Sequence, residues 1–398
     1  MNQNHIIDLQ MKINNENDEY YIEKLNALIY ESNNNILEDT SKNERYLEPR
    51  QERKGCWEWF KGILGCEDVE DNEETSQSPF VGLNNIGNNC YLNAGLQILS
   101  RCYPLLLELL KCNYEKDELI RLFVEIMIAL LFKKDKYYNP SRFVDLFCRR
   151  NEDFIIGKQN CSQDFIRTIL RNINEIFERK ISYKNYNPNN KEELNAYGRY
   201  VLDNNIFPES KAFSIFSGIL KIHINGICSN CNTEVNNYSF SNFVDQILYL
   251  DSFSTKCRLS DVLTKNFGNE NKATMNCPKC KAKINCKSIS KFVKIPEIFI
   301  FTLERFLIRN KVPIEPNEII NVYNYVDETL NINRDICKYE LFAINVRLGE
   351  DISFGHEICH IKEKNQWWTI NDRESHLKYE DYNQNSYGLF YRRIRNES

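Results

Sequence analysis

Apolar side chains recur at helical spacing between residues 90 and 180. YLNAGLQILSRC (91–102) has leucines three and four positions apart, and KDELIRLFVEIMIALLF (116–132) is apolar enough to form a buried helix. Two more helices are predicted, over 141–150 after an Asn-Pro-Ser start signal and over 162–180, with Ser162 as cap and Asp164 in the first turn. The first part of the globular region is therefore expected to be helical.

From about residue 213 the pattern changes to short apolar runs that are typical of strands. These runs are ILKIHI (219–224), FSNFVDQILYL (240–250), KFVKIPEIFIFTLERF (291–306), YELFAINVRL (339–348), WWTI (367–370) and YGLFYRR (387–393). They are rich in β-branched and aromatic residues, as strands are. Helices followed by strands along the chain predict an α+β fold with an antiparallel sheet.

Residues 1–78 differ in composition from the rest of the chain. They combine asparagine clusters, a charged stretch and an acidic run, which predicts a largely flexible extension before a domain that starts near residue 79. Within this extension, DEYYIEKLNALIYES (18–32) fits an amphipathic helix, and GCWEWFKGILGC (55–66) is a short aromatic patch. Binding of a partner or a membrane surface through that patch is the functional alternative.

Composition narrows the classes of protein. The chain has 398 residues, 42% of them hydrophobic, and a net charge of −5, so it can bury a large core and does not resemble a dedicated nucleic-acid-binding protein. No run of 18 or more uncharged apolar residues occurs, so no membrane span is predicted. The N-terminus lacks a secretory signal pattern, which favours a cytoplasmic or nuclear location, or both.

Fifteen cysteines in such a chain indicate metal binding and thiol chemistry more than disulfides. Two C-x-x-C units stand out, Cys228-Ser-Asn-Cys231 and Cys277-Pro-Lys-Cys280. Four thiolates from two such units would close a tetrahedral site, so we expect structural Zn²⁺ there. Cys257 and Cys286 lie nearby in the sequence, and either is an alternative ligand in a rearranged site.

The segment NNIGNNCYLNAGLQ places Cys90 where a Gly-Asn turn enters a helix. The free amides and the dipole at a helix N-terminus favour negative charge, so this position stabilises a nucleophilic thiolate. Asn85 lies five residues earlier, where its side-chain amide would donate to an oxyanion beside the sulfur. The alternative is a buried structural cysteine at a helix start, since most cysteines are inert.

A nucleophilic thiolate needs a base, and the base needs a residue that orients it. FGHEICHIKEKNQWWTINDRES (354–375) supplies both, because His356 follows a glycine and Asn371 follows a strand-like stretch. Asp372 is the adjacent alternative to Asn371 as the orienting residue. The chain order Cys, His, Asn is that of papain-like proteases.

The same segment also contains H-E-x-x-H, from His356 through Glu357 to His360, which is the signature of zinc metalloproteases. That motif requires a helix, so that both imidazoles face one ion. Here no helical period is sustained and no helix with a third ligand follows. A metalloprotease therefore remains only an alternative.

VGLNNIGNNCYLNAGLQIL (81–99) resembles the cysteine box of the ubiquitin-specific proteases, a papain-like deubiquitinase family. The matching positions are Gly82, Leu83, Asn85, Gly87, Asn88, Cys90, Tyr91, Asn93, Leu96 and Gln97. The segment around His356 resembles the histidine box of the family, and FSIFSGILKIHINGICSNC (213–231) and IPEIFIFTLERF (295–306) resemble two of its strands. The resemblance covers about residues 79–394, which we take as one catalytic domain.

This resemblance implies a helical thumb with Cys90, an antiparallel-sheet palm with His356, and zinc-binding β fingers over about residues 213–290. It implies a thiol-dependent deubiquitinase that hydrolyses the isopeptide bond at the ubiquitin C-terminus, with ubiquitin and ubiquitinated proteins as partners. The roles that it assigns are base for His356 and orienting residue for Asn371, and it supports structural Zn²⁺ on Cys228, Cys231, Cys277 and Cys280.

Three positions depart from the family pattern. The helix box Gln-Gln-Asp-Ala-x-Glu-Phe-Leu reads QNCSQDFI (159–166), so Cys161 replaces an acid that faces an arginine of the ubiquitin tail in the family, whereas Gln159 and the acid Asp164 remain as substrate-binding candidates. Loss of one charge-assisted contact lowers the binding free energy by about 1.5–3 kcal/mol. Whether the chain binds ubiquitin or a related modifier is therefore left open.

The other two departures lie closer to the base. Glu357 replaces the family's tyrosine after the histidine, where it would either raise the imidazole pKa or point into solvent, and Arg347 replaces a histidine upstream. The alternative function that the altered helix box and Glu357 suggest is a catalytically weak or inactive module that binds a ubiquitin-like modifier.

Overall fold

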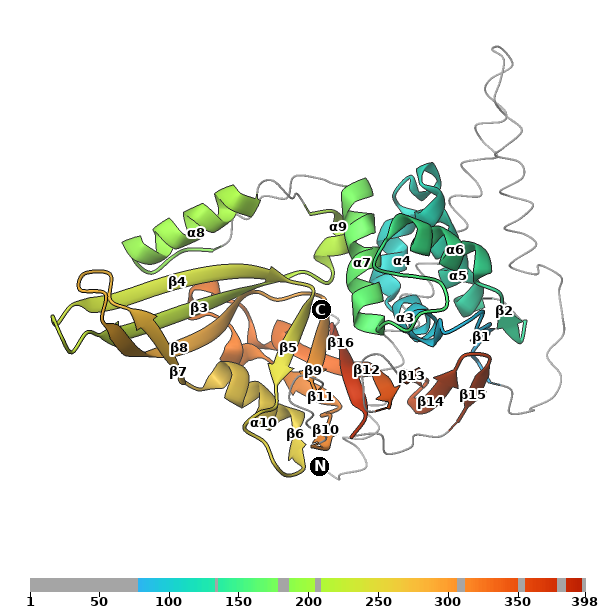
Figure 1. Ribbon diagram of the computed structural model, residues 1–398. Coiled ribbons are helices and arrows are strands. Elements are labelled where there is room, and N and C mark those ends of the chain that lie inside the picture. The colour runs from blue at the N-terminus through green and yellow to red at the C-terminus, as the bar shows by residue number, and fades with distance from the viewer. Residues whose placement is uncertain are drawn as a thin grey trace, which may run out of the picture. The chain divides into compact units, whose positions relative to one another are not determined.

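The computed structural model describes residues 78–132, 135–177, 186–204, 209–305, 312–349, 355–377 and 384–395. The predicted N-terminal extension, with its helix and aromatic patch, lies outside the described residues except for Ser78. The chain divides into two compact units, one of residues up to Phe165 with His356–Glu380, the other of Ile166–Gly355 with Asp381–Ser398 (Figure 1). Helices and antiparallel strands both occur, so the α+β prediction is confirmed.

Helices make up most of the first unit. They are α3 (Cys90–Ser100), α4 (Tyr103–Leu110), α5 (Glu118–Phe132), α6 (Ser141–Arg150) and the first turn of α7 (Ser162–Ile176), with a 3-10 turn at Tyr114–Lys116. Aromatic side chains hold α6 and α7 together, because the ring of Phe147 lies 4.9 Å from that of Phe154 and 5.1 Å from that of Phe165. The helices predicted over 116–132 and 141–150 are confirmed.

The strands of the first unit position residues beside α3. β13 (His356–Glu363), β14 (Gln366–Asn371) and β15 (Glu374–His376) form an antiparallel meander, β1 (Gly82–Leu83) pairs with β2 (Tyr137–Tyr138), and α3 packs against β13. Only glycine fits at position 82, because a Cβ there would lie 2.4 Å from the carbonyl oxygen of Arg373. The Leu83 N–H donates to the Asp372 carbonyl over 2.7 Å, so the turn between β14 and β15 is fixed against β1.

The second unit contains most of the strands, which form two sheets and a short pair. A four-stranded sheet has the order β4 (Glu234–Phe243), β3 (Gly218–Ile227), β8 (Lys283–Lys294), β7 (Asn271–Asn276). A second sheet consists of β12 (Lys338–Leu348), β16 (Ser386–Arg393), β9 (Ile298–Glu304) and β5 (Asp245–Tyr249), with β11 (Ile319–Asn321) on β12. β6 (Cys257–Arg258) and β10 (Ile314–Glu315) form the pair.

The second unit contains the rest of α7 together with α8 (Lys191–Asn204), α9 (Lys211–Ser214) and α10 (Leu259–Leu263). A π turn at Thr264–Gly268 follows α10, and 3-10 turns lie at Tyr323–Tyr325, Glu328–Leu330 and Arg334–Cys337. A buried lysine anchors α8 to the four-stranded sheet. Lys221 of β3 donates to Glu193 of α8 over 2.6 Å and also pairs with Asp327. Removing one partner of such a buried pair costs about 3–5 kcal/mol, so this contact fixes α8 in place.

Candidate active site and metal centre

Cys90 is the first residue of α3 and is buried, with 1% of its surface exposed. The turn before it uses backbone angles that glycine and asparagine tolerate, with φ of 122° at Gly87 and 52° at Asn88. The Asn85 side-chain oxygen accepts from the Gly87 N–H over 3.1 Å and closes this turn. The local sequence therefore places the sulfur at a helix N-terminus, as predicted.

His356 is the first residue of β13, and it contacts both of the other predicted triad members. Its Nε2 donates to Asn371 Oδ1 over 2.7 Å, which leaves Nδ1 for Cys90. The hydrogen bond with Cys90 and then that with Asn371 raise the pKa of His356 to about 9, against the opposing effect of partial burial. The first unit therefore brings a thiol, an imidazole and an amide together in one chain of contacts.

Asp372, the alternative orienting residue, faces other partners. Its φ of 51° is left-handed and turns its side chain toward the segment around α3. Its carboxylate accepts from Asn85 Nδ2 over 2.9 Å and from Asn93 Nδ2 over 2.7 Å. Asp372 therefore holds the predicted oxyanion donor, and Asn93 joins this network although the sequence analysis gave it no role.

The start of α7 differs from the prediction. Ser162 is the first helical residue rather than the cap, and Cys161 takes the cap position, where its sulfur accepts from the Asp164 N–H over 3.4 Å. The Cys161 thiol in turn donates to the exposed Asp164 carboxylate over 3.3 Å. Gln159 Oε1 is buried and has no hydrogen-bond partner among the described residues, so it is an acceptor that lacks a donor.

The structure excludes one of the two alternatives left open for Glu357. This residue is 1% exposed, so the expectation of a side chain in solvent is wrong. The groups that raise the pKa of His356 are Cys90, Asn371 and Asp372. Arg347, the other departure, is also buried, in the second unit.

The H-E-x-x-H interpretation fails on geometry. His356 and His360 lie on β13, a strand, where residues four apart are about 13 Å from each other. One zinc ion binds nitrogens that each lie about 2.1 Å from it, so these two imidazoles cannot share an ion. His360 is fully buried, and its Nδ1 is hydrogen-bonded to Thr369 Oγ1 over 2.9 Å.

The two C-x-x-C motifs come together in the second compact unit. The sulfurs of Cys228, Cys231, Cys277 and Cys280 all lie within 4.8 Å of one another. Between the two motifs, the Sγ–Sγ distances are 3.5 Å for Cys228–Cys280 and 3.6 Å for Cys231–Cys277. Zinc–sulfur bonds of about 2.3 Å in a tetrahedron place sulfurs about 3.8 Å apart, so the four cysteines fit a metal ion with little movement. Cys286 packs in the same apolar cluster but does not belong to this group of four.

The turns that carry the two C-x-x-C motifs have the same backbone conformation. The residue after each second cysteine is left-handed, with φ of 52° at Asn232 and 61° at Lys281. Each of these residues donates its N–H to the carbonyl of the first cysteine, over 2.8 Å to Cys228 and 3.0 Å to Cys277. Both turns are therefore held by the backbone itself.

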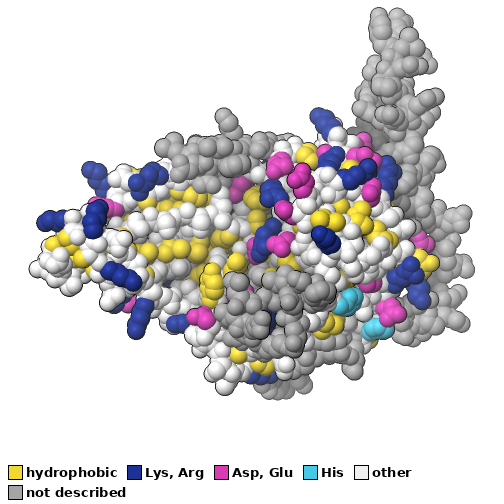
Figure 2. All heavy atoms as spheres, in the orientation of Figure 1, with side chains coloured by type: hydrophobic (Ala, Val, Ile, Leu, Met, Phe, Trp, Pro, Cys, Tyr) yellow, Lys and Arg dark blue, Asp and Glu magenta, His cyan; other side chains and the backbone are white. Residues whose placement is uncertain are grey.

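Charge around this cluster also suits thiolates. The Ala282 backbone N–H and the Asn230 side chain lower the pKa of Cys280 to about 6. Lysines gather at the end of the four-stranded sheet formed by β7 and β8 (Figure 2). They are Lys272, Lys279, Lys281, Lys283 and Lys287. Positive charge of this kind would favour the negative charge that four thiolates carry when they hold a metal ion, although Lys287 is already paired with Glu270 over 2.7 Å.

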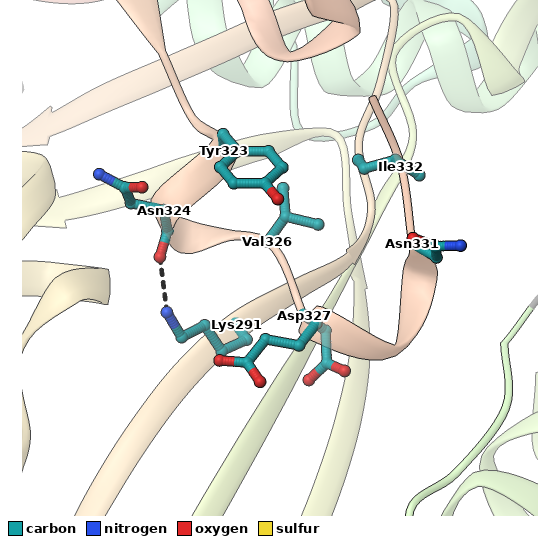
Figure 3. Close-up of a pocket in the computed structure, with 8 residues that line it drawn as sticks. Lys291, Tyr323, Asn324, Val326, Asp327, Asn331 and Ile332 are labelled. Atoms are coloured by element: carbon teal, nitrogen blue, oxygen red, sulfur yellow. Dashed lines mark hydrogen bonds between the residues drawn. The ribbon is translucent and has the colours of Figure 1, made fainter. Parts of the chain in front are cut away.

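A separate cavity of about 360 Å³ lies in the second unit, between β8 and the 3-10 turns that follow β11 (Figure 3). Lys291 donates to the Asn324 carbonyl over 2.6 Å, and Asp327 is paired with Lys221. These charged groups already have partners within the fold. The cavity therefore offers neither a nucleophile nor a set of metal ligands.

Comparisons with known proteins agree on one family. A family model described as "Ubiquitin carboxyl-terminal hydrolase" matches residues 81–391. "Ubiquitin carboxyl-terminal hydrolase 4" of Arabidopsis thaliana is 25% identical over 336 residues, which cover 78% of this chain and 88% of that protein. "Probable ubiquitin carboxyl-terminal hydrolase 4" of Schizosaccharomyces pombe is 23% identical over 323 residues, covering 71% of this chain and 54% of the other.

A solved structure shows the same fold. The matching chain belongs to the SAGA DUB module with Ubp8, bound to monoubiquitin, at 17% identity and a TM-score of 0.58, covering 86% of this chain and 74% of that one.

Among the described helices, none is long and apolar enough to cross a membrane.

Proposed function

Because this chain belongs to the ubiquitin carboxyl-terminal hydrolase family and is a cysteine-type deubiquitinating peptidase, we propose that it hydrolyses the isopeptide bond at the ubiquitin C-terminus with a triad of Cys90, His356 and Asn371. The observation that carries the proposal is the position of His356, in hydrogen-bond contact with both other members. An imidazole between a thiol and an amide oxygen is what a cysteine protease needs.

The reaction begins with transfer of the Cys90 proton to His356. The thiolate attacks the carbonyl carbon of the isopeptide bond, and the carbonyl electron pair moves onto oxygen. When this oxyanion collapses, the C–N bond breaks and His356 protonates the departing lysine amine. His356 then deprotonates a water that attacks the thioester, which releases the ubiquitin carboxylate and restores the Cys90 thiol.

Asn85 is the proposed donor to the oxyanion. Its amide nitrogen carries two hydrogens, and the bond to Asp372 uses one of them. The other hydrogen serves the oxyanion, together with the backbone amides at the start of α3. Asp372 accordingly orients the donor, while Asn371 orients the base.

The helix box is the proposed contact for the ubiquitin tail. Asp164 is exposed and offers its carboxylate to an arginine, and the buried Gln159 Oε1 accepts a backbone N–H of the tail. Cys161 contributes no charge, so the tail keeps one charge-assisted contact here where the family has two.

Cys228, Cys231, Cys277 and Cys280 are the proposed ligands of a structural zinc ion. Four thiolates close the coordination shell, so bound zinc would stabilise the fold and leave no open position for catalysis. The fit of the four sulfurs to a tetrahedron supports this assignment.

The test uses ubiquitin with a C-terminal propargylamide, which reacts with an active-site thiol, and intact mass as the readout. We expect one adduct on the wild type, none on Cys90→Ala, and an undiminished adduct on Cys148→Ala, a control thiol on α6 that is more exposed than Cys90. An adduct that persists in Cys90→Ala refutes the assignment of the nucleophile. Ubiquitin binding without any adduct on the folded wild type would instead favour the binding module.

A further inference from the structure

A buried carboxylate lies directly beside the proposed base. Glu357 follows His356 on β13 and is 1% exposed. Burial of a carboxylate costs several kcal/mol unless hydrogen bonds compensate for the lost water. A glutamate at this position therefore requires defined hydrogen-bond partners.

The partners come from the start of α7. Ser162 donates its backbone N–H to Glu357 Oε2 over 3.1 Å, and its hydroxyl lies within hydrogen-bond distance of the same oxygen. Ser162 is fully buried and is the first residue of a 15-residue helix, where unpaired amides and the helix dipole favour a carboxylate. Glu357 therefore supplies, from a distant strand, a cap for α7.

The same serine reaches the helix that carries the nucleophile. Ser162 Oγ also lies 3.0 Å from the carbonyl oxygen of Tyr91, the residue after Cys90. The hydroxyl has one hydrogen, which it donates to one of these two acceptors or shares between them, so Ser162 lies within hydrogen-bond distance of both the Glu357 carboxylate and the Tyr91 carbonyl. Three elements thus meet at one buried point: β13, α7 and α3.

The backbone of Glu357 adds a fourth contact, to the reacting atom. Its N–H donates to Cys90 Sγ over 3.5 Å. Along a strand, neighbouring side chains point to opposite faces, so anchoring Glu357 on one face fixes the direction of His356 on the other.

We propose that Glu357 is a positioning residue for the proposed reaction: its carboxylate, held by Ser162, fixes the start of β13 so that His356 stays in contact with Cys90. The catalytic role of Glu357 rests on the proposed function, whereas its contacts with Ser162 and Cys90 do not depend on it. A displacement of about 1 Å between reacting groups lowers a rate by about 10²-fold, so an anchor at this point controls kcat more than substrate binding.

The ionisable groups around Glu357 determine which titrations contribute to the pH profile of the reaction. They are Cys90, Tyr91 and Cys161 from the other elements, and His356 on its own strand. Burial, with the nearby Glu357 carboxylate, raises the pKa of the Tyr91 phenol and of the Cys161 thiol. Neither group titrates in the neutral range, so changes there report the Cys90–His356 pair.

The experiment compares Glu357→Ala, Glu357→Gln and Ser162→Ala with the full-length wild type. Glu357→Gln keeps an oxygen that accepts from Ser162, whereas Glu357→Ala removes the anchor. Glu363→Ala is the matched control, because Glu363 lies at the other end of β13 and pairs with Arg101 over 3.3 Å. The readouts are kcat and KM for a ubiquitin fluorogenic substrate from pH 6 to 10, and the rate of Cys90 alkylation by iodoacetamide over the same range.

We expect Glu357→Ala to lower kcat by about 10²-fold with KM changed less than about threefold, and to move the alkaline limb of both profiles to lower pH. Glu357→Gln should recover to within about tenfold of the wild type, Ser162→Ala should fall between them, and Glu363→Ala should keep the wild-type profile. Ubiquitin affinity, measured in a Cys90→Ala background, should not change with Glu357→Ala. If Glu357→Ala does not fold, the test is the kcat of Ser162→Ala compared with that of Glu357→Gln. A lower kcat in Ser162→Ala supports the inference, and equal values contradict it.

An unchanged pH profile in folded Glu357→Ala, or a loss of rate that matches only a loss of folded protein, would overturn the inference. The alkylation readout separates this outcome from failure of the proposed function. If the wild type does not cleave ubiquitin but its Cys90 alkylation still depends on His356 and on Glu357, the proposed function fails and the positioning role stands.

Discussion

The contact between His356 Nε2 and Asn371 Oδ1, 2.7 Å long, gives the sharpest test of the proposed triad. The pKa of His356 is raised to about 9, chiefly by its hydrogen bond with Cys90 and then by that with Asn371. Asn371→Ala removes the second bond and leaves the first. The expected effect is a lower His356 pKa and a ring that no longer has a fixed orientation.

The size of the shift follows from that one bond. A hydrogen bond to a charged group contributes about 1.5–3 kcal/mol, and the lower end applies because the ring is only half-buried and partly screened by water. One pKa unit corresponds to about 1.36 kcal/mol, so the His356 pKa should fall by about one unit. The alkaline limb of kcat, at which the imidazolium is lost, should move from about pH 9 to about pH 8.

The sign of the accompanying stability change is also fixed. Because folding raises the pKa of His356, its protonation stabilises the folded state fully below the unfolded value of about 6.5. That contribution is lost as the pH rises through about 9. In Asn371→Ala the loss should be complete about one unit earlier.

The assay is hydrolysis of ubiquitin–aminomethylcoumarin from pH 6 to 10, with thermal unfolding measured in the same buffers. Glu374→Ala is the control, because this exposed residue lies opposite Asn371 across the β14–β15 turn and its carboxylate faces the imidazole of His376, not that of His356. An alkaline limb that stays in place in Asn371→Ala would show that another group maintains the His356 pKa. The assignment of Asn371 would then be wrong, and Asp372→Ala would be the next variant.

Two further predictions concern the oxyanion donor and the metal site. Asn85→Ala should lower kcat for the same substrate by about 10²–10³-fold with little change in KM, and an equal rise in KM alone would contradict an oxyanion role. Cys280→Ser should abolish stoichiometric zinc, measured by elemental analysis of the purified protein, and lower the unfolding temperature by several degrees. Wild-type protein that is folded and contains no metal would refute the zinc assignment.

Much of the fold follows from hydrophobic pattern. The helix predicted over 141–150 has those bounds in the structure, since its Asn-Pro-Ser start and its apolar face both mark it. α4 was not predicted, because YPLLLELL is apolar apart from Glu108 and periodicity alone does not distinguish a short buried helix from a strand. The same kind of signal placed His360 correctly outside a helical zinc motif, since the segment lacks a period of 3.6.

The roles within the site were less accessible from sequence. Asn371 and Asp372 are neighbours with similar side chains, and only the left-handed backbone at Asp372 sends one toward the imidazole and the other toward Asn85. Glu357 is a charged residue that burial statistics place in solvent, and only its pairing with Ser162, distant in sequence, explains why it is inside. Contacts of this kind depend on tertiary structure, which local patterns do not encode.

The first unit is discontinuous, and this has a consequence for synthesis of the protein. Cys90 and Glu357 are separated by 267 positions, and the whole of Ile166–Gly355 folds into the second unit between them. At about 5–20 residues per second, the ribosome releases the thiol many seconds before the histidine exists. A nascent or prematurely terminated chain therefore carries the proposed nucleophile without the proposed base, so on this proposal hydrolytic capacity appears only when translation is nearly complete.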